Sequence, residues 1–432
     1  MNPLYNAGIS LYRGAARVMS LGSPKVRHML DGQRNTLERI RTFRRKMAPE
    51  GFDVWFHAAS LGEFEQARPL IEALLHARPS AKVLLSFFSP SGYEVRVNFN
   101  PRVAVVYLPF DLPSRVEAFL DAACPRMAIF VKYEFWGNYL AGLKRRGIPV
   151  YIISAIFRPG QIFFRPWGGE FRKMLGAFTR LYVQDERSRQ LLASIGVENA
   201  TVAGDTRFDR VTTIRSACRA IPEVEIFCNA ASSSAPVVVV GSSWERDENV
   251  YVPWLKKHPD VRAIIAPHEF DKVRLASLCR RLGTDRSMLL SEFVAICSRS
   301  SAEARSVAAR IRYLIVDCFG LLSSLYRYAD IAYVGGGFGA GIHNINEAAV
   351  YGVPVVFGPR HQKFNEARGL MDCGGGFSIN SETQAAAVLD RLASDAGARR
   401  AAGKAAGDYI ASHIGATPLI MKDIFNIDIE KN

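Results

Sequence analysis

The fold is decided by one stretch of the sequence, Tyr333-Val334-Gly335-Gly336-Gly337-Phe338-Gly339-Ala340-Gly341-Ile342-His343-Asn344-Ile345-Asn346-Glu347-Ala348-Ala349. Its apolar start predicts a β-strand, its glycines predict a loop, and its end predicts a helix. Glycines let backbone amides approach an anionic ligand closely, and a helix N-terminus adds partial positive charge. The stretch has neither the GxGxxG dinucleotide fingerprint nor the GK[ST] of a P-loop. We therefore expect it to bind a nucleotide-activated substrate at the carboxyl end of a parallel strand.

Two polar side chains of this stretch, Asn344 and Glu347, are candidates for contact with that ligand. They lie three residues apart, so a helix places both on one face of its first turn, where a carboxylate can accept hydrogen bonds from a ribose diol. Alternatively, Asn344 is an N-cap and Glu347 its capping-box partner. The segment Tyr351–Pro359 favours the ligand, because it predicts a second strand that ends in Gly-Pro beside the first. The expected nucleotide-side residues of this region are Gly336, Gly337, Gly339, His343, Asn344 and Glu347.

Short apolar runs alternate with longer amphipathic runs from about residue 50 onwards. This alternation predicts an α/β fold with parallel sheets that helices cover on both faces. A chain of 432 residues exceeds the size of a single core, so we expect two domains. The expected strands are Val54–His57, Val83–Phe87, Val103–Tyr107, Met127–Val131, Val150–Ser154 and Arg180–Gln184, then Val237–Gly241, Ala263–Ala266, Tyr313–Val316, Ile331–Gly335 and Pro354–Phe357.

The gap between the two series of strands gives the expected domain boundaries. Residues 209–235 end in a run of alanine and serine that is typical of a linker. We therefore expect an N-terminal membrane-associating helix and basic arm at 1–46, a Rossmann-like acceptor domain at 47–208 and a Rossmann-like nucleotide domain at 236–405. A C-terminal helix at 406–432 should pack back across the boundary. Ligands of doubly wound sheets bind beyond the carboxyl ends of the strands, so we expect the two domains to face a central cleft.

A second strand–loop–helix segment, His57-Ala58-Ala59-Ser60-Leu61-Gly62-Glu63-Phe64-Glu65, contains a candidate general base. Glu63 would project from the loop and take a proton from an attacking hydroxyl, and Ser60 and Gly62 would lie beside the acceptor. The alternative is structural, since acidic residues favour helix N-termini because of the helix dipole. That alternative explains Glu65 better than it explains Glu63.

Two more segments add polar side chains after strands. Val131–Asn138 places Glu134 among aromatic residues, either as a site carboxylate or as a paired structural one. Phe157–Trp167 is basic and aromatic, which is typical either of a flap in which Arg158 and Arg165 meet an acidic, apolar acceptor or of a surface loop without a role.

Three residues of the second half of the chain are candidates for contact with a phosphate. Ser242 and Ser243 end a strand just before a helix, so their amides could hold a phosphate. His268 ends the next strand and could donate to a phosphate oxygen, although a lone histidine is more often structural.

Basic charge is concentrated at the N-terminus. The net charge is +14, and residues 1–46 hold ten Lys or Arg against two acidic residues. Residues 3–22 are mostly apolar but too short a run for a spanning helix, and the basic residues follow them, unlike those of a signal peptide. Arg13 and Arg17 would share one helix face. We expect a peripheral or monotopic helix on a membrane surface; the alternative is a helix packed on the protein itself. Nucleic acid is not expected, because aromatic stacking platforms are not interleaved with the basic residues.

The cysteines do not predict a disulfide framework or a metal site. There are seven, an odd number, scattered and without a CxxC pair. The chain is therefore expected to be reduced and cytoplasmic, with neither a metal nor a cofactor.

Together these segments resemble the 3-deoxy-D-manno-octulosonic acid (Kdo) transferases of Gram-negative lipopolysaccharide synthesis. Gly-His-Asn-Pro-Leu-Glu followed by Gly-x-Pro-Val-x-Phe-Gly-Pro is characteristic of that family, and this chain has Ile342–Glu347 followed by Gly352–Pro359. The likeness runs over nearly the whole chain and includes the apolar N-terminus, His57–Glu63, Tyr133–Asn138, Gly204–Asp209 and Gly241–Ser243.

The resemblance implies a GT-B fold and an inverting, metal-independent transferase on the cytoplasmic face of the bacterial inner membrane. CMP-Kdo would be the donor and a lipid A precursor the acceptor. Glu63 would be the catalytic base, Glu134 a second essential glutamate, and Asn344 and Glu347 nucleotide contacts.

The chain departs from the family pattern at three places. Pro267-His268-Glu269 stands where the family often has Arg-His-Pro-Glu, so a phosphate-binding arginine is missing there. Arg207 stands where lysine is usual, and Ser154-Ala155-Ile156 replaces Asn-Ala-Arg, which leaves Arg158 as an approximate substitute. Two alternatives stay open: another GT-B transferase or epimerase that uses a UDP-sugar, and a basic, membrane-associated nucleotide-binding scaffold.

Overall fold

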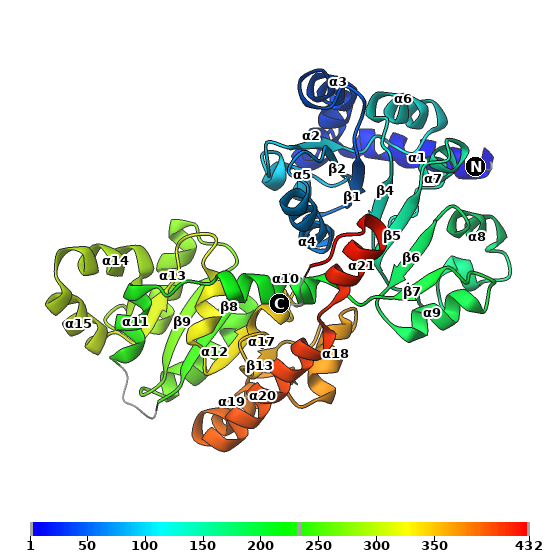
Figure 1. Ribbon diagram of the computed structural model, residues 1–432. Coiled ribbons are helices and arrows are strands. Elements are labelled where there is room, and N and C mark those ends of the chain that lie inside the picture. The colour runs from blue at the N-terminus through cyan, green and yellow to red at the C-terminus, as the bar shows by residue number, and fades with distance from the viewer. Residues whose placement is uncertain (1–2, 231–234, 430–432) are drawn as a thin grey trace. The chain divides into compact units, whose positions relative to one another are not determined.

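The computed structural model describes residues 3–230 and 235–429, and they form two compact units (Figure 1). The first unit comprises Met1–Arg210 together with Ile414–Asn432, and the second comprises Val211–His413. The chain leaves the first unit inside helix α10 (Thr206–Ala217) and returns to it between α20 (Ala396–His413) and α21 (Ala416–Phe425). The first unit is therefore built from two separate stretches of sequence.

The described residues of the first unit contain a seven-stranded parallel sheet in the order β3-β2-β1-β4-β5-β6-β7. Its central strands are almost wholly buried, because apolar side chains pack on both faces of the sheet. The strands are β1 (Val54–His57), β2 (Val83–Phe87), β3 (Val103–Tyr107), β4 (Ala128–Val131), β5 (Val150–Ala155), β6 (Arg180–Val183) and β7 (Ala200–Val202).

The helices of the first unit follow the strands in alternation, and α21 joins them from the other end of the chain. They are α1 (Pro3–Met19), α2 (Pro24–Arg34), α3 (Thr36–Met47), α4 (Leu61–Ala77), α5 (Pro90–Arg96), α6 (Pro113–Ala123), α7 (Gly137–Arg145), the short 3-10 helix η1 (Ile162–Phe164), α8 (Gly169–Leu175), α9 (Glu186–Ala193) and α21.

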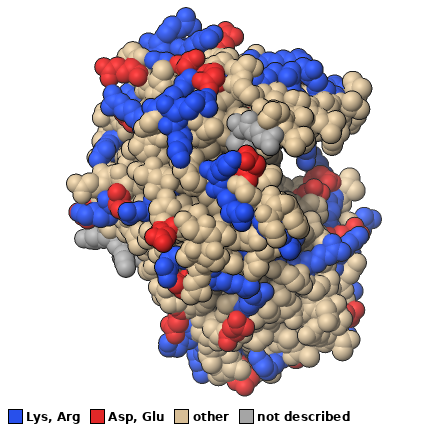
Figure 2. All heavy atoms as spheres, turned by 90° about the vertical axis from the view of Figure 1, so that its right-hand side faces the viewer, with Lys and Arg blue, Asp and Glu red and all other residues tan. Residues whose placement is uncertain are grey.

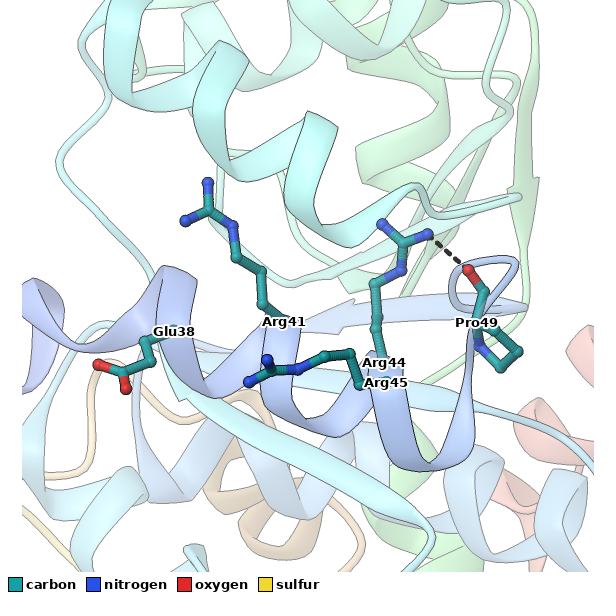
Figure 3. Close-up of a pocket in the computed structure, with 5 residues that line it drawn as sticks. All are labelled: Glu38, Arg41, Arg44, Arg45 and Pro49. Carbon is teal, nitrogen blue, oxygen red and sulfur yellow. Dashed lines mark hydrogen bonds between the residues drawn. The ribbon is translucent and has the colours of Figure 1, made fainter.

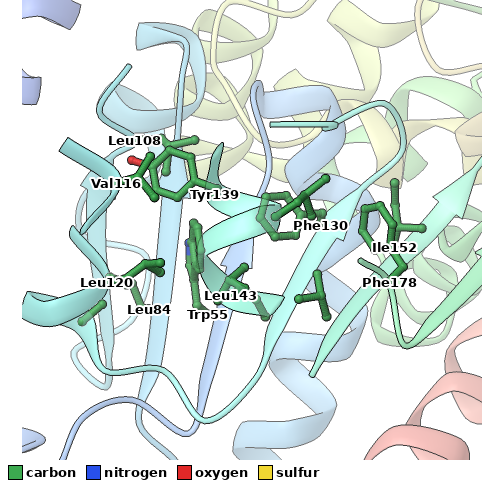
Figure 4. Packing of buried hydrophobic residues seen from close by; sticks show 14 of the residues in the cluster. Trp55, Leu84, Leu108, Val116, Leu120, Phe130, Tyr139, Leu143, Ile152 and Phe178 are labelled. Atoms are coloured by element: carbon green, nitrogen blue, oxygen red, sulfur yellow. The ribbon is translucent and has the colours of Figure 1, made fainter. Parts of the chain in front are cut away.

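Aromatic side chains form the centre of the core on one face of this sheet (Figure 4). Trp55 is fully buried on β1, and its ring lies 4.9 Å from that of Phe119, 5.2 Å from that of Phe130 and 5.5 Å from that of Tyr139. Such aromatic pairs contribute about 0.5–1.5 kcal/mol each beyond the area they bury. The strand that carries the candidate site at its end is thus rigidly held.

The described residues of the second unit contain a second seven-stranded parallel sheet, in the order β10-β11-β9-β8-β12-β13-β14. The strands are β8 (Val237–Ser243), β9 (Arg262–Pro267), β10 (Ser287–Leu289), β11 (Tyr313–Ile315), β12 (Ile331–Val334), β13 (Val355–Phe357) and β14 (Gly376–Ser378). The helices are α10, α11 (Pro222–Asn229), α12 (Glu245–Lys257), α13 (Lys272–Leu282), α14 (Leu290–Arg299), α15 (Ser301–Arg310), α16 (Leu322–Leu325), the 3-10 helix η2 (Tyr326–Tyr328), α17 (Asn346–Ala349), α18 (Asn365–Asp372), α19 (Glu382–Ser394) and α20.

The α/β prediction is confirmed, and all the expected strands form within about two residues of the expected ends. Three strands were missed: β7, β10 and β14. Each has three residues and lies at the edge of its sheet, where partial exposure removes the apolar run that marks a central strand.

The expected linker and the expected C-terminal helix both differ from the prediction, because each contains parts of two helices. Residues 209–235 contain most of α10 and all of α11, and the serines 232–234 lie outside the described residues. Residues 406–432 contain the end of α20 and the whole of α21, with Gly415 at a φ of 114° between them. Residues 430–432 also lie outside the described range.

Asp209 fixes the point where the chain returns to the first unit. Its carboxylate accepts hydrogen bonds from the backbone N–H groups of Gly415 (2.6 Å) and Thr417 (2.7 Å), at the N-terminus of α21. At the other end of α21, Arg78 donates to the carbonyl of Phe425 at 2.6 Å. Both contacts hold α21 within the first unit, where it packs on α4.

Replacing Asp209 with alanine should therefore loosen α21. Loss of a carboxylate cap costs about 1–2 kcal/mol, which corresponds to roughly 5- to 30-fold faster hydrogen exchange of the α21 amides by local opening. Asp271→Ala is a matched control, because Asp271 caps α13 through the amides of Val273 and Arg274 at 3.0 Å each. That control should change exchange in α13 and leave α21 as it is. Unchanged protection of α21 in Asp209→Ala would contradict the role of this cap.

Candidate active site

Glu63 lies just beyond the carboxyl end of β1, in the first turn of α4. Its Oε2 accepts a hydrogen bond from the backbone N–H of Ala59 at 2.6 Å, and the N–H of Ser60 also donates to the carboxylate. The side chain therefore caps its own helix, which is the structural role weighed against catalysis. Ser60 and Gly62 lie beside it at the start of α4, where we expected them.

Glu134 follows β4, which is the neighbour of β1 in the sheet. Its Oε2 lies 3.0 Å from His57 Nε2 and accepts a hydrogen bond from Trp136 Nε1 at 2.5 Å. His57 is the last residue of β1 and is fully buried, and its Nδ1 lies 2.9 Å from Ser86 Oγ on β2. Glu134 is thus hydrogen-bonded and nearly buried, at the end of a chain of polar groups that starts in the core.

The two carboxylates affect each other electrostatically. Burial, and after it the negative charge of Glu134, raises the pKa of Glu63 to about 7, against the opposing effects of the Ala59 amide and of Lys132. A carboxylate whose pKa lies near neutral pH is a better proton acceptor than an ordinary one and is still partly ionised. Lys132 itself has a φ of 62°, a strained conformation for a residue with a side chain.

Tyr133 links the predicted flap to this carboxylate pair. Burial raises the pKa of the Tyr133 hydroxyl, the charges of Arg158 and Arg207 lower it, and the charge of Glu63 also acts on it. These side chains therefore gather at one place in the first unit. Arg165 is exposed, and among the described residues no charge interaction joins it to Glu63 or to Glu134.

The segment 157–167 is only partly a surface loop. Phe163 is buried in η1, with its ring 4.9 Å from that of Phe135 and 6.0 Å from that of Phe157. Trp167, by contrast, is 72% exposed. One half of the segment is thus anchored in the core and the other half is available at the surface.

Asp205 organises the neighbouring part of the site and was not among the expected site residues. Its buried carboxylate accepts hydrogen bonds from Gln66 Nε2 at 3.0 Å, Gln184 Nε2 at 3.1 Å and Arg207 Nη2 at 2.8 Å. Burial opposes ionisation, but the charge and hydrogen bonds of Arg207 leave the pKa of Asp205 below its ordinary value. The guanidinium of Arg207 is therefore held in place beside Tyr133. The only signal for Asp205 in the sequence was the run Gly204–Asp209.

In the second unit, the glycine-rich stretch brings the ends of three neighbouring strands together. A Cβ atom on Gly335 would lie 2.4 Å from the carbonyl oxygen of Ser242, and one on Gly337 would lie 2.6 Å from Gly358 Cα. Gly336 has a φ of 89°, which favours glycine. Close approach of backbone to backbone is thus required here, whereas the expected approach of backbone amides to an anionic ligand stays a prediction.

Three rings lie together beside this loop. The ring of His268 stacks at 4.5 Å on both Trp244 and His343, and Trp244 Nε1 donates to His343 Nε2 at 3.3 Å. Burial, and after it the charge of His268, lowers the pKa of His343 to about 4, so this imidazole is neutral at pH 7. His268 and His343 are thus brought together as expected. Trp244 was missed, because nothing in the local sequence separates it from a core tryptophan.

The two serines at the end of β8 differ in their surroundings. Ser242 is partly exposed and has a φ of 53°, a strained conformation at the start of α12. Ser243 is buried, and its Oγ lies 3.3 Å from the hydroxyl of Tyr251. The side chain of Ser243 is therefore part of the core, and only its backbone remains for a phosphate.

Asn344 and Glu347 contact each other directly. Asn344 Nδ2 donates to Glu347 Oε1 at 3.0 Å, and Asn344 Oδ1 accepts from the backbone N–H of Asn346 at 3.3 Å. Ile345, and not Asn344, is the N-cap of α17. Asn344 Oδ1 nevertheless accepts from the first turn as a capping side chain does, so the capping alternative stays open. The hydrogen bond between Asn344 and Glu347 fixes the orientation of the Glu347 carboxylate. This orientation is compatible both with a local turn and with a contact to a ribose.

An apolar stripe runs along α1. Leu4, Leu11 and Val18, seven residues apart, are 79%, 76% and 69% exposed. On another part of the helix Arg13 is partly buried, and its desolvation, followed by the charges of Arg115 and Arg17, lowers its pKa. Three guanidinium groups so close together favour an anion. Figure 2 shows further clusters of Lys and Arg side chains on one face of the molecule, with fewer acidic side chains among them.

Arginines of α3 surround a hollow of about 610 Å³ (Figure 3). Arg44 is occupied, since it donates to the carbonyls of Pro49 at 2.8 Å and of Ala122 at 2.9 Å. Arg41 and Arg45 are exposed and extend away from that contact.

In the described part of the chain no helix combines the length and the apolarity needed to cross a bilayer. The same residues contain no group of three or more His, Cys, Asp or Glu side chains arranged to hold a metal ion.

The raised pKa of Glu63 predicts a pH-dependent stability. A folded-state pKa of about 7, above the ordinary 4.5, means that folding favours the neutral carboxyl. This stability is fully present below pH 4.5 and is lost as the pH rises through 7. Glu63→Gln removes the charge, so it should be more stable than the unchanged protein by about 1–3 kcal/mol at pH 8 and equal to it near pH 4.5. Urea unfolding followed by circular dichroism at both pH values tests this.

Glu65→Gln is the control on the same helix. It removes an ion pair with Arg96 at 3.2 Å and a second with Arg68 at 3.7 Å, so no gain at pH 8 is expected. A difference between Glu63→Gln and the unchanged protein that is the same at both pH values would contradict the raised pKa.

Comparison with known proteins shows which proteins this chain is similar to. A family model described as 3-deoxy-D-manno-octulosonic-acid transferase matches residues 33–210, which include both carboxylates. The 3-deoxy-D-manno-octulosonic acid transferase of Bordetella pertussis is 27% identical over 390 residues, which cover 86% of this chain and 87% of that protein. The transferase of the same name from Haemophilus influenzae is 24% identical over 431 residues, covering 96% of this chain and 95% of that protein.

Among solved structures, UDP-GlcNAc 2-epimerase from Neisseria meningitidis bound to UDP-GlcNAc superposes with a TM-score of 0.59. It is 14% identical, and the match covers 87% of this chain and 100% of that one, so it reports on the fold. With two parallel seven-stranded sheets, the fold is of the GT-B type with two Rossmann-like domains. The chain is thus similar to Kdo transferases over most of its length, and the model of that family matches its residues 33–210.

Proposed function

We propose that this chain is an inverting glycosyltransferase that moves Kdo from CMP-Kdo to a lipid A precursor of the lipid IVA type, in lipopolysaccharide inner-core synthesis. One observation carries the proposal: Glu63 is a partly buried carboxylate with a pKa of about 7, next to the charge of Glu134, in a chain similar to Kdo transferases over most of its length. A group that is half ionised at neutral pH is suited to take a proton from a sugar hydroxyl.

In this mechanism Glu63 removes the proton of the acceptor hydroxyl while that oxygen attacks the anomeric carbon of Kdo. The proton moves to the Glu63 carboxylate, and CMP leaves from the opposite face of the sugar. Proton transfer neutralises Glu63, so it relieves the repulsion between Glu63 and Glu134. Glu134 thus helps catalysis because it makes the protonated product of the base more favourable.

The donor side stabilises the charge that develops on CMP. Shortly after Ser242 and Ser243, the first backbone amides of α12 form a helix N-terminus, where partial positive charge favours a phosphate; the N–H of the N-cap Trp244 itself donates to Asp247 Oδ2 at 2.9 Å. The glycine loop supplies further amides, and Asn344 and Glu347 hold the ribose. His268 donates to a phosphate oxygen. The proposed donor-side residues of the loop are Gly336, Gly337 and Gly339. The N–H groups of Gly336 and Gly339 donate to Asp247 Oδ2 at 3.0 Å and to the Gly336 carbonyl at 2.8 Å, so among these three the proposed amide donor is Gly337. His343 supports the ring of His268.

The acceptor side lies around the start of α4. Ser60 and Gly62 contact the sugar that carries the attacking hydroxyl. Arg158 meets negative charge on the acceptor, and the guanidinium of Arg207, which Asp205 holds in place, adds to the same field. Arg165 and the exposed Trp167 meet the more distant apolar part of the acceptor.

Replacing Glu63 with glutamine should abolish most transfer. The loss of a general base costs about 10²- to 10⁴-fold in kcat, with little change in the KM for CMP-Kdo. The product is followed by mass spectrometry of the lipid after incubation with CMP-Kdo, and UDP-sugars are tested in parallel as donors. Glu65→Gln, in the same helix turn, should keep near-normal kcat. No transfer from CMP-Kdo by the unchanged protein, or a fully active Glu63→Gln, would overturn the proposal.

We further propose that α1 and α3 hold the protein on the cytoplasmic face of the bacterial inner membrane. The apolar stripe of Leu4, Leu11 and Val18 suits the boundary between headgroups and acyl chains. Arg41 and Arg45 would contact anionic headgroups beside it. The lipid acceptor resides in the same surface, so this association would keep its sugars within reach of the site.

Flotation with lipid vesicles tests this association. The double variant Leu4→Gln/Leu11→Gln should lose more than about tenfold in vesicle binding, because each buried leucine contributes about 1.5–3 kcal/mol. The double variant Arg41→Gln/Arg45→Gln should lose binding to anionic vesicles alone, by about 1 kcal/mol per arginine, and the loss should shrink at high salt. Val273→Thr removes an exposed valine of α13 and serves as the control. Equal binding by all of these proteins would exclude α1 and α3 as the membrane contact.

A further inference from the structure

The buried hydrogen bonds around Glu134 run in one direction. Trp55 Nε1 donates to Ser86 Oγ at 2.8 Å, and an indole N–H acts only as a donor. Ser86 Oγ therefore accepts on that side, and its own hydrogen has two acceptors within reach, of which His57 Nδ1 at 2.9 Å is nearer than the carbonyl of Phe56 at 3.5 Å. His57 then carries its hydrogen on Nε2, which lies 3.0 Å from Glu134 Oε2. Every donor in this series has an acceptor, and the series ends on a carboxylate.

The other neutral tautomer of His57 fits these contacts poorly. A hydrogen on Nδ1 would be donated to the backbone carbonyl of Ser86 at 3.1 Å. The unprotonated Nε2 would then face Glu134 Oε2 at 3.0 Å, with one lone pair against another. Trp136 Nε1 donates to that same oxygen at 2.5 Å and to His57 Nε2 at 3.1 Å, so a single shared hydrogen, nearer to the oxygen, is all that would lie between the two lone pairs. The hydroxyl of Ser86 favours the first tautomer, because it can donate to a bare Nδ1 and the Ser86 carbonyl cannot.

We propose that Ser86 is a positioning residue for catalysis: by donating to His57 Nδ1, it selects the tautomer that leaves Glu134 ionised beside Glu63. Ser86 is fully buried on β2 and is paired with His57 in the sheet register. It acts through His57 and Glu134 and touches no substrate. The catalytic consequence rests on the proposed function, whereas the tautomer of His57 does not.

Removal of this hydroxyl changes the charge next to the base. Without Ser86 Oγ, the neighbour of Nδ1 is a carbonyl oxygen, so Nδ1 takes up a proton in order to donate to it. His57 and Glu134 then share one more proton, and the net charge of the pair changes from −1 to 0.

Charges other than that of Glu134 also act on the base. Among them Lys132, from the same segment after β4, lowers the pKa of Glu63. The amides of Ala59 and Ser60 act on it from the side of α4, and the neutral Tyr133 hydroxyl lies nearby. Without the opposing charge of Glu134, these groups all favour the ionised form, and Glu63 becomes a weaker base that ionises at lower pH.

The test is the pH profile of kcat/KM for transfer from CMP-Kdo, measured between about pH 5.5 and 9. In Ser86→Ala the acidic limb should move to lower pH by about 1 unit, and the plateau rate should fall by roughly 3- to 10-fold. Ser86→Thr keeps the hydroxyl and should restore the original limb. Ser287→Ala removes a buried hydroxyl that donates to the Gly283 carbonyl in the second unit, and it should leave the profile unchanged. A uniform loss of rate in Ser86→Ala with the limb in its original place would overturn the proposal.

A second measurement does not depend on activity. The ring nitrogens of the protein labelled with ¹⁵N-histidine report which nitrogen carries the hydrogen, and His57 is assigned through the signal lost in His57→Gln. At pH 7.5 the unchanged protein should show a bare Nδ1 and a protonated Nε2, and Ser86→Ala should show a protonated Nδ1. A protonated Nδ1 in the unchanged protein would refute the role of Ser86. If transfer from CMP-Kdo is absent but the nitrogen signals are as expected, the proposed function fails and the tautomer assignment stands.

Discussion

Parallel pairing of β1 with β2 on one side and β4 on the other is the constraint on which the first unit depends. Parallel strands end at the same edge of a sheet, so His57, Ser86 and the segment that carries Glu134 must meet there. Their side chains lie in a buried environment, where hydrogen bonds and like charges act more strongly than in water. The raised pKa of Glu63 is a consequence of that edge, and packing around Trp55 keeps the edge rigid.

The second unit repeats the same geometry with different chemistry. The ends of β8, β12 and β13 meet through glycines and backbone amides. Beside them the imidazole of His343, with its lowered pKa, is neutral at pH 7. Repelling negative charges in one unit favour uptake of a proton, and fixed dipoles in the other favour a departing anion. A group transfer requires both of these properties.

Sequence patterns predicted the central strands and the residues that follow them, because a buried parallel strand is a continuous apolar run with a change of composition at its end. The sequence alone identified four candidate site residues in this way: Glu63, Glu134, Asn344 and Glu347. The roles of Ser86 and Asp205 were not, since each depends on a neighbour that lies far away in the chain and on the register of strand pairing. The burial of the Ser243 side chain could not be predicted for the same reason. Its hydroxyl contacts that of Tyr251, and only the packing of the folded chain brings the two hydroxyls together.

The capping of α21 by Asp209 bears on how the protein is made. The first unit needs the last helix of the chain, but the whole of the second unit, Val211–His413, is synthesised before that helix. During translation the first unit must therefore wait with its α4 surface uncovered, while the second unit has all of its own residues. The second unit is thus complete on the ribosome before the first unit, although most of the first unit precedes it in the sequence. An apolar surface that stays exposed until α21 has been synthesised is a surface that chaperones recognise.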